Sequence, residues 1–311
     1  DGIRDLVRSR GLGDVYKRQA LVDRKPKELI GKKICGDGIG IKHLEFLLKK
    51  GLPIDEEEVI VNRIKKAFLE SPDGSKVFEF EVKGQLAIIN RHNFGQALLT
   101  GTQEEGVTLF DNTHFRSIAR KEGVVHAHFT GKNNESITLT APLVVDGSGV
   151  NSKIREDPAI FGASGKLNDD EQYYCYREIC ELENAPEHYS DGVVFKFSYE
   201  HTKGGYMWFF NRQGREYNLG TGIPKSWISE KTPKEVFQQI MLRTLQKGKV
   251  IDEGGGFVPT RHPLASHVQD NIILVGDAGL IVNPMHGGGL SASLASGYLA
   301  GKIAAQQVPA E

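Results

Sequence analysis

The sequence has no long hydrophobic run, few cysteines and no excess of charge of either sign. No stretch of about 18 apolar residues occurs, so no segment is predicted to span a bilayer. The cysteines are Cys35, Cys175 and Cys180. Such a sparse, odd set is no disulfide framework and favours a reducing compartment. The 39 basic and 40 acidic residues leave a net charge of −1, which excludes the overall electrostatic footprint of a nucleic-acid-binding protein.

The N-terminal segment is polar and charged. Because it has no apolar core, we do not expect a secretory signal. The sequence predicts a cytoplasmic protein and leaves peripheral contact with a membrane open. Residues 11–19 read GLGDVYKRQ, a string that resembles adapter read-through in translated metagenomic assemblies. We therefore expect residues 1–19 to be non-native and the true start of the gene to be missing. An ordinary basic tail is the alternative.

The chain is long enough for one large domain or two, at 311 residues. Its 39% hydrophobic and 25% charged residues suit a folded protein with a sizeable core. Glycine is abundant, with 36 residues. Because the glycines cluster, they indicate tight backbone geometry rather than low complexity.

Hydrophobic periodicity predicts a mixture of strands and helices without internal repeats. Two short apolar runs, Leu143–Val145 and Asn271–Val275, are expected to be fully buried strands. Helices are expected at 91–106, 232–246 and 287–306, the second with Thr232 as its cap. The predicted strands are 77–82, 107–110, 124–130, 136–140, 143–145, 172–179, 193–198, 206–210, 217–221 and 271–275. The mixture indicates an α+β or α/β chain whose middle is more antiparallel than its two ends.

The strongest signal for chemistry lies after the second of these buried strands. The strand ends in Gly-Asp-Ala at 276–278, and Pro284 and the triple glycine Gly287–Gly289 follow where a helix begins. Asp277, at the carboxyl end of the strand, can accept hydrogen bonds from ribityl or ribose hydroxyl groups. The glycines let the backbone approach a flat or anionic ligand, and the positive end of the helix dipole favours the partial negative charge of a reduced flavin. A glycine-rich loop that binds no ligand is the alternative.

This string resembles the FAD-binding signature of the glutathione-reductase-type flavoproteins. More narrowly, it resembles that of the geranylgeranyl reductase family, which reads close to GDAAG followed by NPxxGGGI. Gly279 stands where that family more often has alanine, and Leu290 replaces isoleucine. The resemblance implies FAD as the cofactor. It implies cofactor contacts at Gly276, Asp277, Pro284, Gly287, Gly288 and Gly289.

Two further segments resemble cofactor-binding motifs of the same family. Residues 144–155 read VVDGSGVNSKIR, and the resemblance implies cofactor contacts at Asp146 and Gly147. An ordinary turn after a strand is the alternative. Arg91 opens a segment that resembles the Arg-x-x-Phe-Asp-x-x-Leu helix lining the FAD site, although Gly95 replaces the usual acidic residue. For Arg91, a solvated arginine at a helix start is the alternative.

An aromatic segment resembles the substrate site of that family. Residues 206–210 and 218–222 resemble its YxWxFP and GxG pattern, with Asn211 in place of the proline. The resemblance implies an apolar tunnel for an isoprenoid chain, because aromatic rings bury much area with few rotamers. An aromatic strand in a core is the alternative. The substrate-binding residues that the resemblance implies are Tyr206, Trp208, Phe210, Gly220 and Gly222.

Cys35 lies in the glycine-rich run Cys-Gly-Asp-Gly at 35–38. In the family that this chain resembles, a Cys-Gly motif at this place lies near the flavin ring and the substrate. The resemblance therefore implies that Cys35 is catalytic, with a role open to being positional rather than acid–base. A small buried hydrophobic side chain is the alternative. Cys175 and Cys180 have no metal-ligand spacing with nearby histidines and are predicted to be structural, so no metal is expected.

The resemblance implies a fragment of the glutathione-reductase-type FAD-binding fold with an inserted antiparallel-sheet substrate domain. Residues 20–155 and 256–311 would form the two parts of the FAD-binding domain, and residues 156–255 the substrate or catalytic domain. Such a fold needs a first strand, a GxGxxG turn and a helix to hold the ADP moiety. We expect this first βαβ unit to be missing, because the run Gly36–Gly40 follows no predicted strand. The chain as it stands is expected to bind FAD poorly.

The function implied by the resemblance is FAD-dependent saturation of isoprenoid double bonds, as in archaeal membrane-lipid synthesis. The substrate would be an isoprenoid lipid or diphosphate. The sequence does not distinguish NAD(P)H from ferredoxin as the electron donor, and it identifies no proton donor. A second hypothesis is an aromatic hydroxylase or halogenase of the same fold. A third is a non-catalytic isoprenoid-binding protein with a decayed flavin site.

Resequencing of the source DNA upstream of Ala20 tests these predictions together. We expect codons for a strand, a GxGxxG turn, a helix and an acidic residue for the adenosine ribose. An unrelated upstream sequence, or a genuine start codon near residue 1, would contradict the FAD assignment for this chain and favour the lipid-binding protein.

Overall fold

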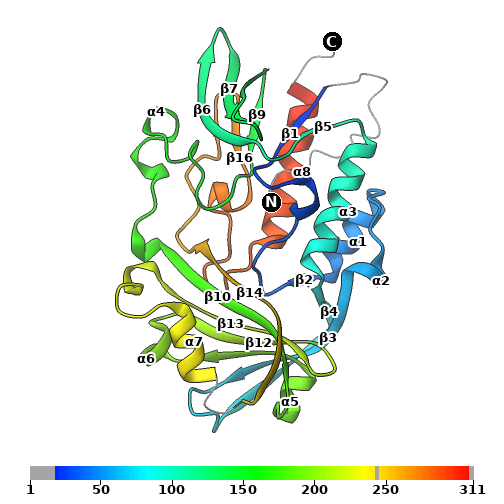
Figure 1. Cartoon of the computed structure of the whole chain (residues 1–311), viewed down its shortest axis with the longest axis vertical. Helices are drawn as coiled ribbons and strands as arrows, with labels where there is room; N and C mark the ends of the chain where they lie inside the picture. Colours follow the sequence, from blue (N-terminus) through cyan, green and yellow to red (C-terminus); the bar gives the residue numbers. More distant parts are fainter. Residues whose placement is uncertain (1–17, 242–244, 308–311) are drawn as a thin grey trace.

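A strongly curled sheet is the largest element of the computed structural model, which describes residues 18–241 and 245–307 (Figure 1). Its strands follow the order β14-β10-β13-β12-β11-β3-β4-β2. Neighbouring strands are antiparallel except for β11 and β3, which run parallel. The strands are β2 (Gly38–Gly40), β3 (Ile60–Glu70), β4 (Val77–Ile89), β10 (Gln172–Leu182), β11 (Gly192–Phe197), β12 (Tyr206–Gln213), β13 (Glu216–Pro224) and β14 (Lys247–Pro259).

The side chains of the curled sheet alternate between its two faces, as in any strand. In β12, Phe209 joins a buried cluster with Phe237 of helix α7 (Pro233–Met241). Trp208, the residue before it, joins a different cluster on the opposite face. Helix α5 (Glu187–Ser190) contributes to the first cluster. One face of the sheet is therefore covered by α7 and α5, and the other faces the rest of the molecule.

Three smaller sheets and the longer helices form the other half of the molecule (Figure 1). Strand β1 pairs in parallel with β5, and β9 pairs in parallel with β16, which also pairs with β15. Strands β6, β7 and β8 form an antiparallel meander. These strands are β1 (Ala20–Val22), β5 (Thr108–Phe110), β6 (His114–Lys121), β7 (Val124–Thr130), β8 (Ser136–Ala141), β9 (Val144–Asp146), β15 (Val268–Gln269) and β16 (Ile272–Leu274).

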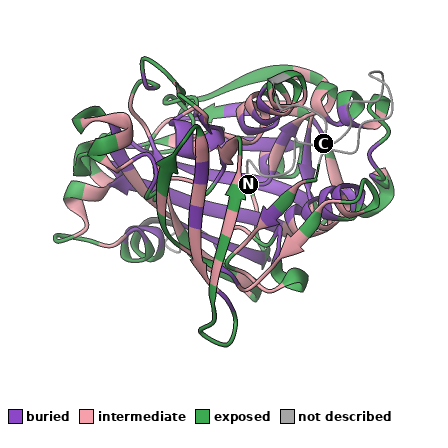
Figure 2. Cartoon of the chain, turned by 90° about the horizontal axis from the view of Figure 1, so that it is seen from above, coloured by how far each residue is buried: buried purple, intermediate pink, exposed green. Residues whose placement is uncertain are grey.

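One apolar cluster joins the helices of this half to the edge of the curled sheet. It includes Ile39 of β2, Leu44 of α1, Phe94 of α3 and Leu294 of α8. Figure 2 shows buried residues concentrated in the strands through the middle of the molecule and exposed residues at its loops and outer helix faces. The helices are α1 (Ile41–Lys49), α2 (Glu56–Val59), α3 (Arg91–Glu104), α4 (Pro158–Phe161), α6 (Tyr199–Thr202) and α8 (Leu290–Gln307). The 3₁₀ turns are η2 (Lys27–Leu29), η3 (Ala163–Gly165), η4 (Asp169–Glu171), η5 (Lys225–Trp227) and η6 (Gly276–Gly279).

Short polar side chains fix where several helices begin. Asn90 Oδ1 accepts two backbone N–H bonds of 3.1 Å at the start of α3. Asp55 and Asp157 accept one such bond each, at 2.9 Å, at the starts of α2 and α4. These bonds satisfy N–H groups that the first turn of a helix leaves without a partner. The cap at Asn90 fixes the position of the next residue, Arg91.

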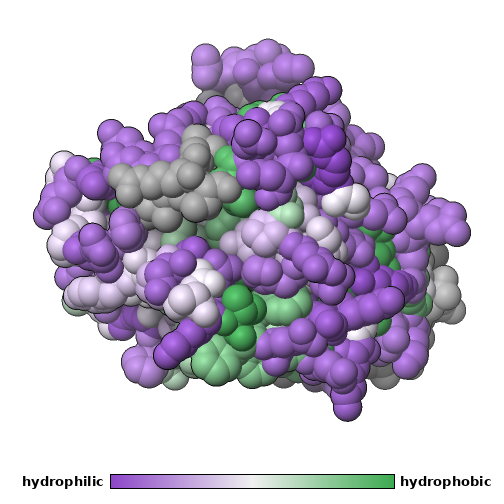
Figure 3. Space-filling model, turned by 90° about the horizontal axis from the view of Figure 1, so that it is seen from below, coloured by the Kyte–Doolittle hydropathy of each residue, from purple (hydrophilic) through white to green (hydrophobic). Residues whose placement is uncertain are grey.

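The hairpin of β3 and β4 carries apolar side chains to the surface. Phe78 and Phe80 are 60% and 49% exposed. Leu69 pairs with Phe78 on one side and with Phe195 on the other, so these side chains lie on one face of the sheet. Figure 3, which views the molecule from below, shows apolar surface among the polar side chains. No helix in the described part of the chain is long and apolar enough to span a bilayer.

The structure confirms a mixed α/β fold with antiparallel strands in its middle. Each predicted strand is present, most with boundaries that differ by up to three residues, whereas the strand predicted for 77–82 continues to Ile89. The strands β2, β3 and β4 come from the segment predicted as the first part of the FAD-binding domain, and they complete the same sheet as β10–β14. Residues 1–17 of the segment expected to be non-native lie outside the described residues.

Two of the predicted elements are wrong in detail. Strand β9 is only partly buried at Val144 and Val145, because both line a cavity. The helix predicted for 232–246 does not reach its expected end, because Gln246 O accepts a hydrogen bond of 2.9 Å from Glu183 N at the start of β14. The elements α1, β3 and β14 were not predicted. Strand β14 contains Gly254–Gly256, and glycine is depleted in strands.

Replacement of Phe237 should test how strongly α7 holds the curled sheet. Its ring is fully buried and lies 5.3 Å from that of Tyr176, centroid to centroid. We expect Phe237→Ala to lower the free energy of unfolding by about 3–5 kcal/mol, because it leaves a cavity in a packed core. Gln238→Ala on the exposed side of α7 is the control and should change it by less than about 0.5 kcal/mol. Equal denaturation midpoints for both variants would contradict this packing.

Candidate functional site

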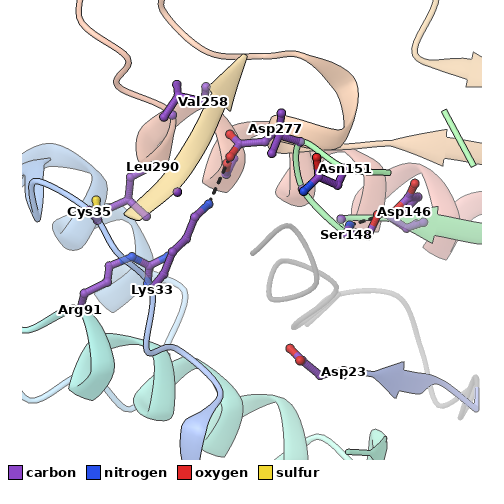
Figure 4. A pocket seen from close by; sticks show the side chains of 18 of the residues that line it. Asp23, Lys33, Cys35, Arg91, Asp146, Ser148, Asn151, Val258, Asp277 and Leu290 are labelled. Atoms are coloured by element: carbon purple, nitrogen blue, oxygen red, sulfur yellow. Dashed lines mark hydrogen bonds and ion pairs between the residues drawn. The ribbon is translucent and has the colours of Figure 1, made fainter. Parts of the chain in front are cut away.

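A cavity of about 2300 Å³ lies between the curled sheet and the half that contains the longer helices. Its walls come from segments far apart in the sequence. Among them are residues 32–40, the turn 146–151, the aromatic strands β11 and β12, and the segment 283–293. Figure 4 shows Lys33 reaching across this space to Asp277, with Arg91 and Cys35 nearby.

Most of the predicted site residues line this one cavity. They are Cys35, Arg91, Asp146, Gly147, Tyr206, Trp208, Phe210, Gly222, Asp277, Pro284, Gly287, Gly288 and Gly289. Gly220 and Gly276 do not line it. The fold therefore brings together motifs that the sequence spreads over more than 250 residues, from Cys35 to Gly289.

Asp277 forms one wall together with the glycines before α8. It lies on η6, which directly follows β16, and its Oδ2 accepts a hydrogen bond of 3.1 Å from Lys33 Nζ. A Cβ atom at Gly289 would lie 2.9 Å from Asp277 Oδ1. Gly287 has a φ of +63°, in the left-handed region that favours glycine. The chain thus places a carboxylate beside a turn that has no room for a side chain.

The turn before α8 is held by its own backbone bonds. Gly287 N donates to Asn283 O at 2.9 Å, and Asn283 N donates to Gly288 O at 3.3 Å. Because α8 begins at Leu290, its positive dipole end points toward the cavity wall formed by these residues. Gly276 has a packing role instead, since a Cβ atom there would lie 2.6 Å from Ser293 Oγ in α8. It brings η6 and α8 close together.

Asp146 shapes the turn that follows β9. Its Oδ1 accepts a bond of 2.8 Å from Ser148 N, and its Oδ2 accepts a bond from Ser152 Oγ. Arg155 is fully buried and donates from Nε to Gly165 O at 2.8 Å. The serine and arginine of this motif therefore hold the loop, and the backbone of Gly147 lines the cavity.

Arg91 is buried rather than solvated, with 6% of its surface exposed. It is the first residue of α3, after the Asn90 cap, and its guanidinium lies 5.7 Å from the ring centroid of Phe94. Of the two alternatives that the sequence left open for Arg91, the solvated arginine is wrong for this chain, because the side chain is buried. A buried cation on a cavity wall suits an electron-rich or anionic ligand.

Cys35 lies near Arg91 in a tight turn. Its side chain is partly exposed, and its Sγ accepts a bond of 3.3 Å from Asp37 N. Gly36 packs against the aromatic wall, since a Cβ atom there would lie 3.0 Å from Phe210 Cε2. Burial raises the pKa of the Cys35 thiol, and the Asp37 carboxylate raises it further. Cys35 is therefore a neutral thiol at neutral pH.

Aromatic rings form the apolar wall. The ring centroids of Phe195 and Phe210 are 5.2 Å apart, those of Phe195 and Tyr206 are 5.5 Å apart, and those of Tyr206 and Trp208 are 6.0 Å apart. Trp208 Nε1 donates to Asn218 Oδ1 at 2.9 Å, which satisfies its polar end. The rings come from β11 and β12 by alternation, so they lie on one face of the sheet.

The two glycines of the predicted substrate motif differ in what they do. A Cβ atom at Gly220 would lie 2.1 Å from Trp208 Cζ2, so the indole fills the place of a side chain there. A Cβ atom at Gly222 would lie 2.8 Å from Cys175 Sγ. Gly220 makes room for the Trp208 ring without lining the cavity, whereas Gly222 lines it.

Sequence reasoning missed three polar residues of this region as site residues. Lys33 pairs with Asp277 across the cavity, and Asn218 and Asp37 join the Cys35 turn to the sheet. Burial raises the pKa of Asp37 to about 6, although Arg177 and Arg212 oppose the shift. Asp37 lies in the Cys-Gly-Asp-Gly run at 35–38, and Asn218 opens the segment 218–222. Their place in these two motifs was the signal that could have identified them as site residues.

The sequence comparisons find similarity to geranylgeranyl reductases. Residues 171–258 match the model of the geranylgeranyl reductase catalytic domain. The chain is 31% identical over 288 residues to a digeranylgeranylglycerophospholipid reductase of Sulfolobus acidocaldarius. That match covers 91% of this chain and 62% of the relative, so the chain spans less than two thirds of that relative's length.

Solved structures share the fold. A geranylgeranyl bacteriochlorophyll reductase-like protein from Thermoplasma acidophilum superposes with a TM-score of 0.79 at 20% identity, covering 93% of this chain and 72% of the other. The flavin-dependent halogenase CmlS superposes with a TM-score of 0.69 at 15% identity, covering 91% of this chain and 53% of the other. At these identities the likeness is one of fold.

Alkylation of Cys35 tests the electrostatics of its turn. Because its pKa is raised above the ordinary value of 9.0, we expect slow alkylation by iodoacetamide at neutral pH and a rate that rises beyond pH 9.0. Peptide mass mapping separates Cys35 from Cys175 and Cys180, and Cys35→Ser is the control that loses the label. Rapid alkylation that is independent of pH between 7 and about 9 would contradict a neutral thiol with a raised pKa.

Proposed function

This chain belongs to the geranylgeranyl reductase family, and from this we propose that it carries out FAD-dependent reduction of the double bonds of isoprenoid chains. The observation that carries the proposal is the single cavity in which Cys35 and an aromatic wall lie together with Asp277 and the glycine turn 287–289. One part of this cavity has the polar groups that a flavin needs, and another has the apolar surface that an isoprenoid chain needs.

The residues present fit a flavin. Asp277 supplies a carboxylate acceptor, and Gly287 and Gly289 have conformations or contacts that exclude side chains, which leaves the backbone accessible. Arg91 supplies a buried cation on the cavity wall. We propose that these residues, with Asp146, Gly147, Pro284 and Gly288, hold FAD. When bound in its reduced form, FAD supplies the hydride for the reduction.

We propose that the protein positions the substrate rather than activating it strongly. An isolated double bond is not polarised, so rate must come from orientation and from electrostatic help for developing charge. Tyr206, Trp208 and Phe210 would bind the chain and exclude water from the reacting carbons. Cys35, a neutral thiol on the same cavity, would lie beside them. Gly222 would keep the wall open next to the rings.

The substrate class follows from the two kinds of side chain that line the cavity. An apolar chain suits the aromatic wall, and an anionic headgroup or diphosphate suits the basic side chains that also line the cavity. Besides Lys33 and Arg91 on the proposed flavin side, these basic residues include Lys42, Arg116 and Lys153. We therefore propose an isoprenoid lipid or isoprenoid diphosphate as the substrate, with an external electron donor that reduces the flavin. We also propose that residues 20–155 and 256–311 hold the cofactor and residues 156–255 the substrate, with β2, β3 and β4 of the first segment completing the substrate sheet.

A competing proposal is oxygen insertion. A flavin-dependent halogenase shares the fold, so the fold alone does not separate the two reactions. The long aromatic wall favours an extended apolar chain, because Phe195, Tyr206, Trp208 and Phe210 form a continuous run of ring contacts. A compact aromatic substrate would leave much of this wall without contact.

The mass of the product separates these reactions. We expect the protein, loaded with FAD and reduced anaerobically with dithionite, to convert geranylgeranyl diphosphate or a digeranylgeranyl lipid into products that have gained pairs of hydrogen atoms. A product that has gained oxygen under aerobic conditions, with no anaerobic product, would contradict reduction. A protein that includes any residues found upstream of Ala20, and that binds the isoprenoid but takes up no flavin, would favour the non-catalytic alternative.

Flavin binding itself is checked with Asp277→Ala. Loss of a hydrogen bond to a charged acceptor costs about 1.5–3 kcal/mol, so FAD affinity should fall by about tenfold to a hundredfold. Asp169→Ala is the matched control, because Asp169 is an exposed carboxylate that pairs with Lys225 and does not line the cavity. Equal FAD affinity for the two variants in a fluorescence titration would contradict the role of Asp277.

A further inference from the structure

Asp37 is an unusual residue for its surroundings. Its side chain is 1% exposed, and its φ of +65° lies in the left-handed region that glycine favours. Non-glycine residues adopt this region seldom, because the Cβ atom crowds the backbone there. A buried charge in such a conformation needs partners. The partners show what the residue does.

The carboxylate of Asp37 is bound by two side chains of the curled sheet. Its Oδ2 accepts a bond of 2.9 Å from Asn218 Nδ2 and a bond of 3.2 Å from Arg212 Nη1. Both partners are buried, Asn218 completely. Arg212 also donates from Nε to Glu216 at 2.6 Å, which fixes the direction of its guanidinium. The carboxylate is therefore anchored to strands β12 and β13.

Asn218 connects this anchor to Cys35 and to the aromatic wall. Its Nδ2 donates to the backbone oxygen of Cys35 at 2.8 Å as well as to Asp37. Its Oδ1 accepts the indole bond from Trp208 at 2.9 Å. The Asn218 amide thus donates both of its N–H groups to the cysteine turn, and its oxygen accepts from the tryptophan. The distance between Cys35 and Trp208 is set through this side chain.

The backbone of the turn leaves it little other freedom. Asp37 N donates to Cys35 Sγ at 3.3 Å, and Ile89 N donates to Asp37 O at 2.9 Å. Gly36 lies against Phe210 with no space for a side chain. The backbone N–H of Asp37 therefore contacts the thiol, and the carboxylate of the same residue is anchored to the sheet.

We infer that Asp37 is the positioning residue for Cys35, and that it acts with Asn218 and Arg212 to hold the thiol at a fixed place beside Trp208. The inference rests on the proposed function only in placing Cys35 where the substrate reacts. The positioning itself is a property of the chain. It can be measured without cofactor or turnover.

The test is the rate at which iodoacetamide alkylates Cys35 in the folded protein. We expect Asn218→Ala to raise the rate at neutral pH about tenfold, because it releases the Cys35 carbonyl and the Asp37 carboxylate together. Asp37→Asn should raise it as much or more, because it also removes a nearby like charge that raises the thiol pKa. Peptide mass mapping assigns the label to Cys35.

Asn211→Ala is the matched control. Asn211 is a buried asparagine of β12 that bonds to Asn62 and Gly214 and makes no hydrogen bond to the turn. It should leave the alkylation rate within twofold of the unchanged protein. Thermal unfolding of each variant shows whether it is folded, and Asn218→Ser is a milder change should Asn218→Ala not fold.

The outcomes decide separately on the inference and on the proposed function. Alkylation rates within twofold of the unchanged protein in the Asp37 and Asn218 variants would overturn the inference, as would an equal rise in Asn211→Ala. Failure of all Asp37 and Asn218 variants to fold, with Asn211→Ala folded, would overturn it too, because the network would then be a condition of folding. A raised rate together with a product that has gained oxygen would keep the positioning role and contradict the reductase.

Discussion

The alternation of side chains along the central strands of the curled sheet is the constraint on which the rest of this structure depends. In β12, Phe209 packs with Phe237 on one face, and Trp208 faces the cavity on the other. The same strand therefore supplies the core under α7 and the apolar wall of the candidate site. A shift of one residue in register would exchange the two sets. The stability of the sheet and the lining of the cavity are thus one property.

The polar half of the cavity is formed by residues at the ends of strands and helices rather than within strands. Its residues come from places where strands end and helices begin, such as Asp277 after β16 and Arg91 at the start of α3. The ends of strands and helices present backbone N–H groups and allow short turns, which suits a ligand with many hydrogen-bonding groups. The curled sheet provides the apolar wall, and the ends of strands and helices provide the polar groups. A cofactor and an apolar chain can therefore share one cavity.

Much of this arrangement could be predicted from the sequence, because the signals were local. The strand at 206–210 follows from its aromatic run, and the turn at Gly287–Gly289 follows from its glycines. The burial of Arg91 could not be predicted, because it depends on how α3 packs. The pair of Lys33 and Asp277 joins residues 244 positions apart, and Asp37 meets Asn218 across 181 positions. Such partners follow from the fold and leave no pattern in a single sequence.

The contact between Gly220 and Trp208 has a consequence for how related sequences can vary. The indole occupies the space that a Cβ atom at position 220 would need, at a separation of 2.1 Å. Position 220 can therefore gain a side chain only where position 208 has given up its large ring. Over evolutionary time the two positions are bound to change together. A comparison of many relatives would show covariation between positions 208 and 220, and its physical cause would be the volume of the indole ring.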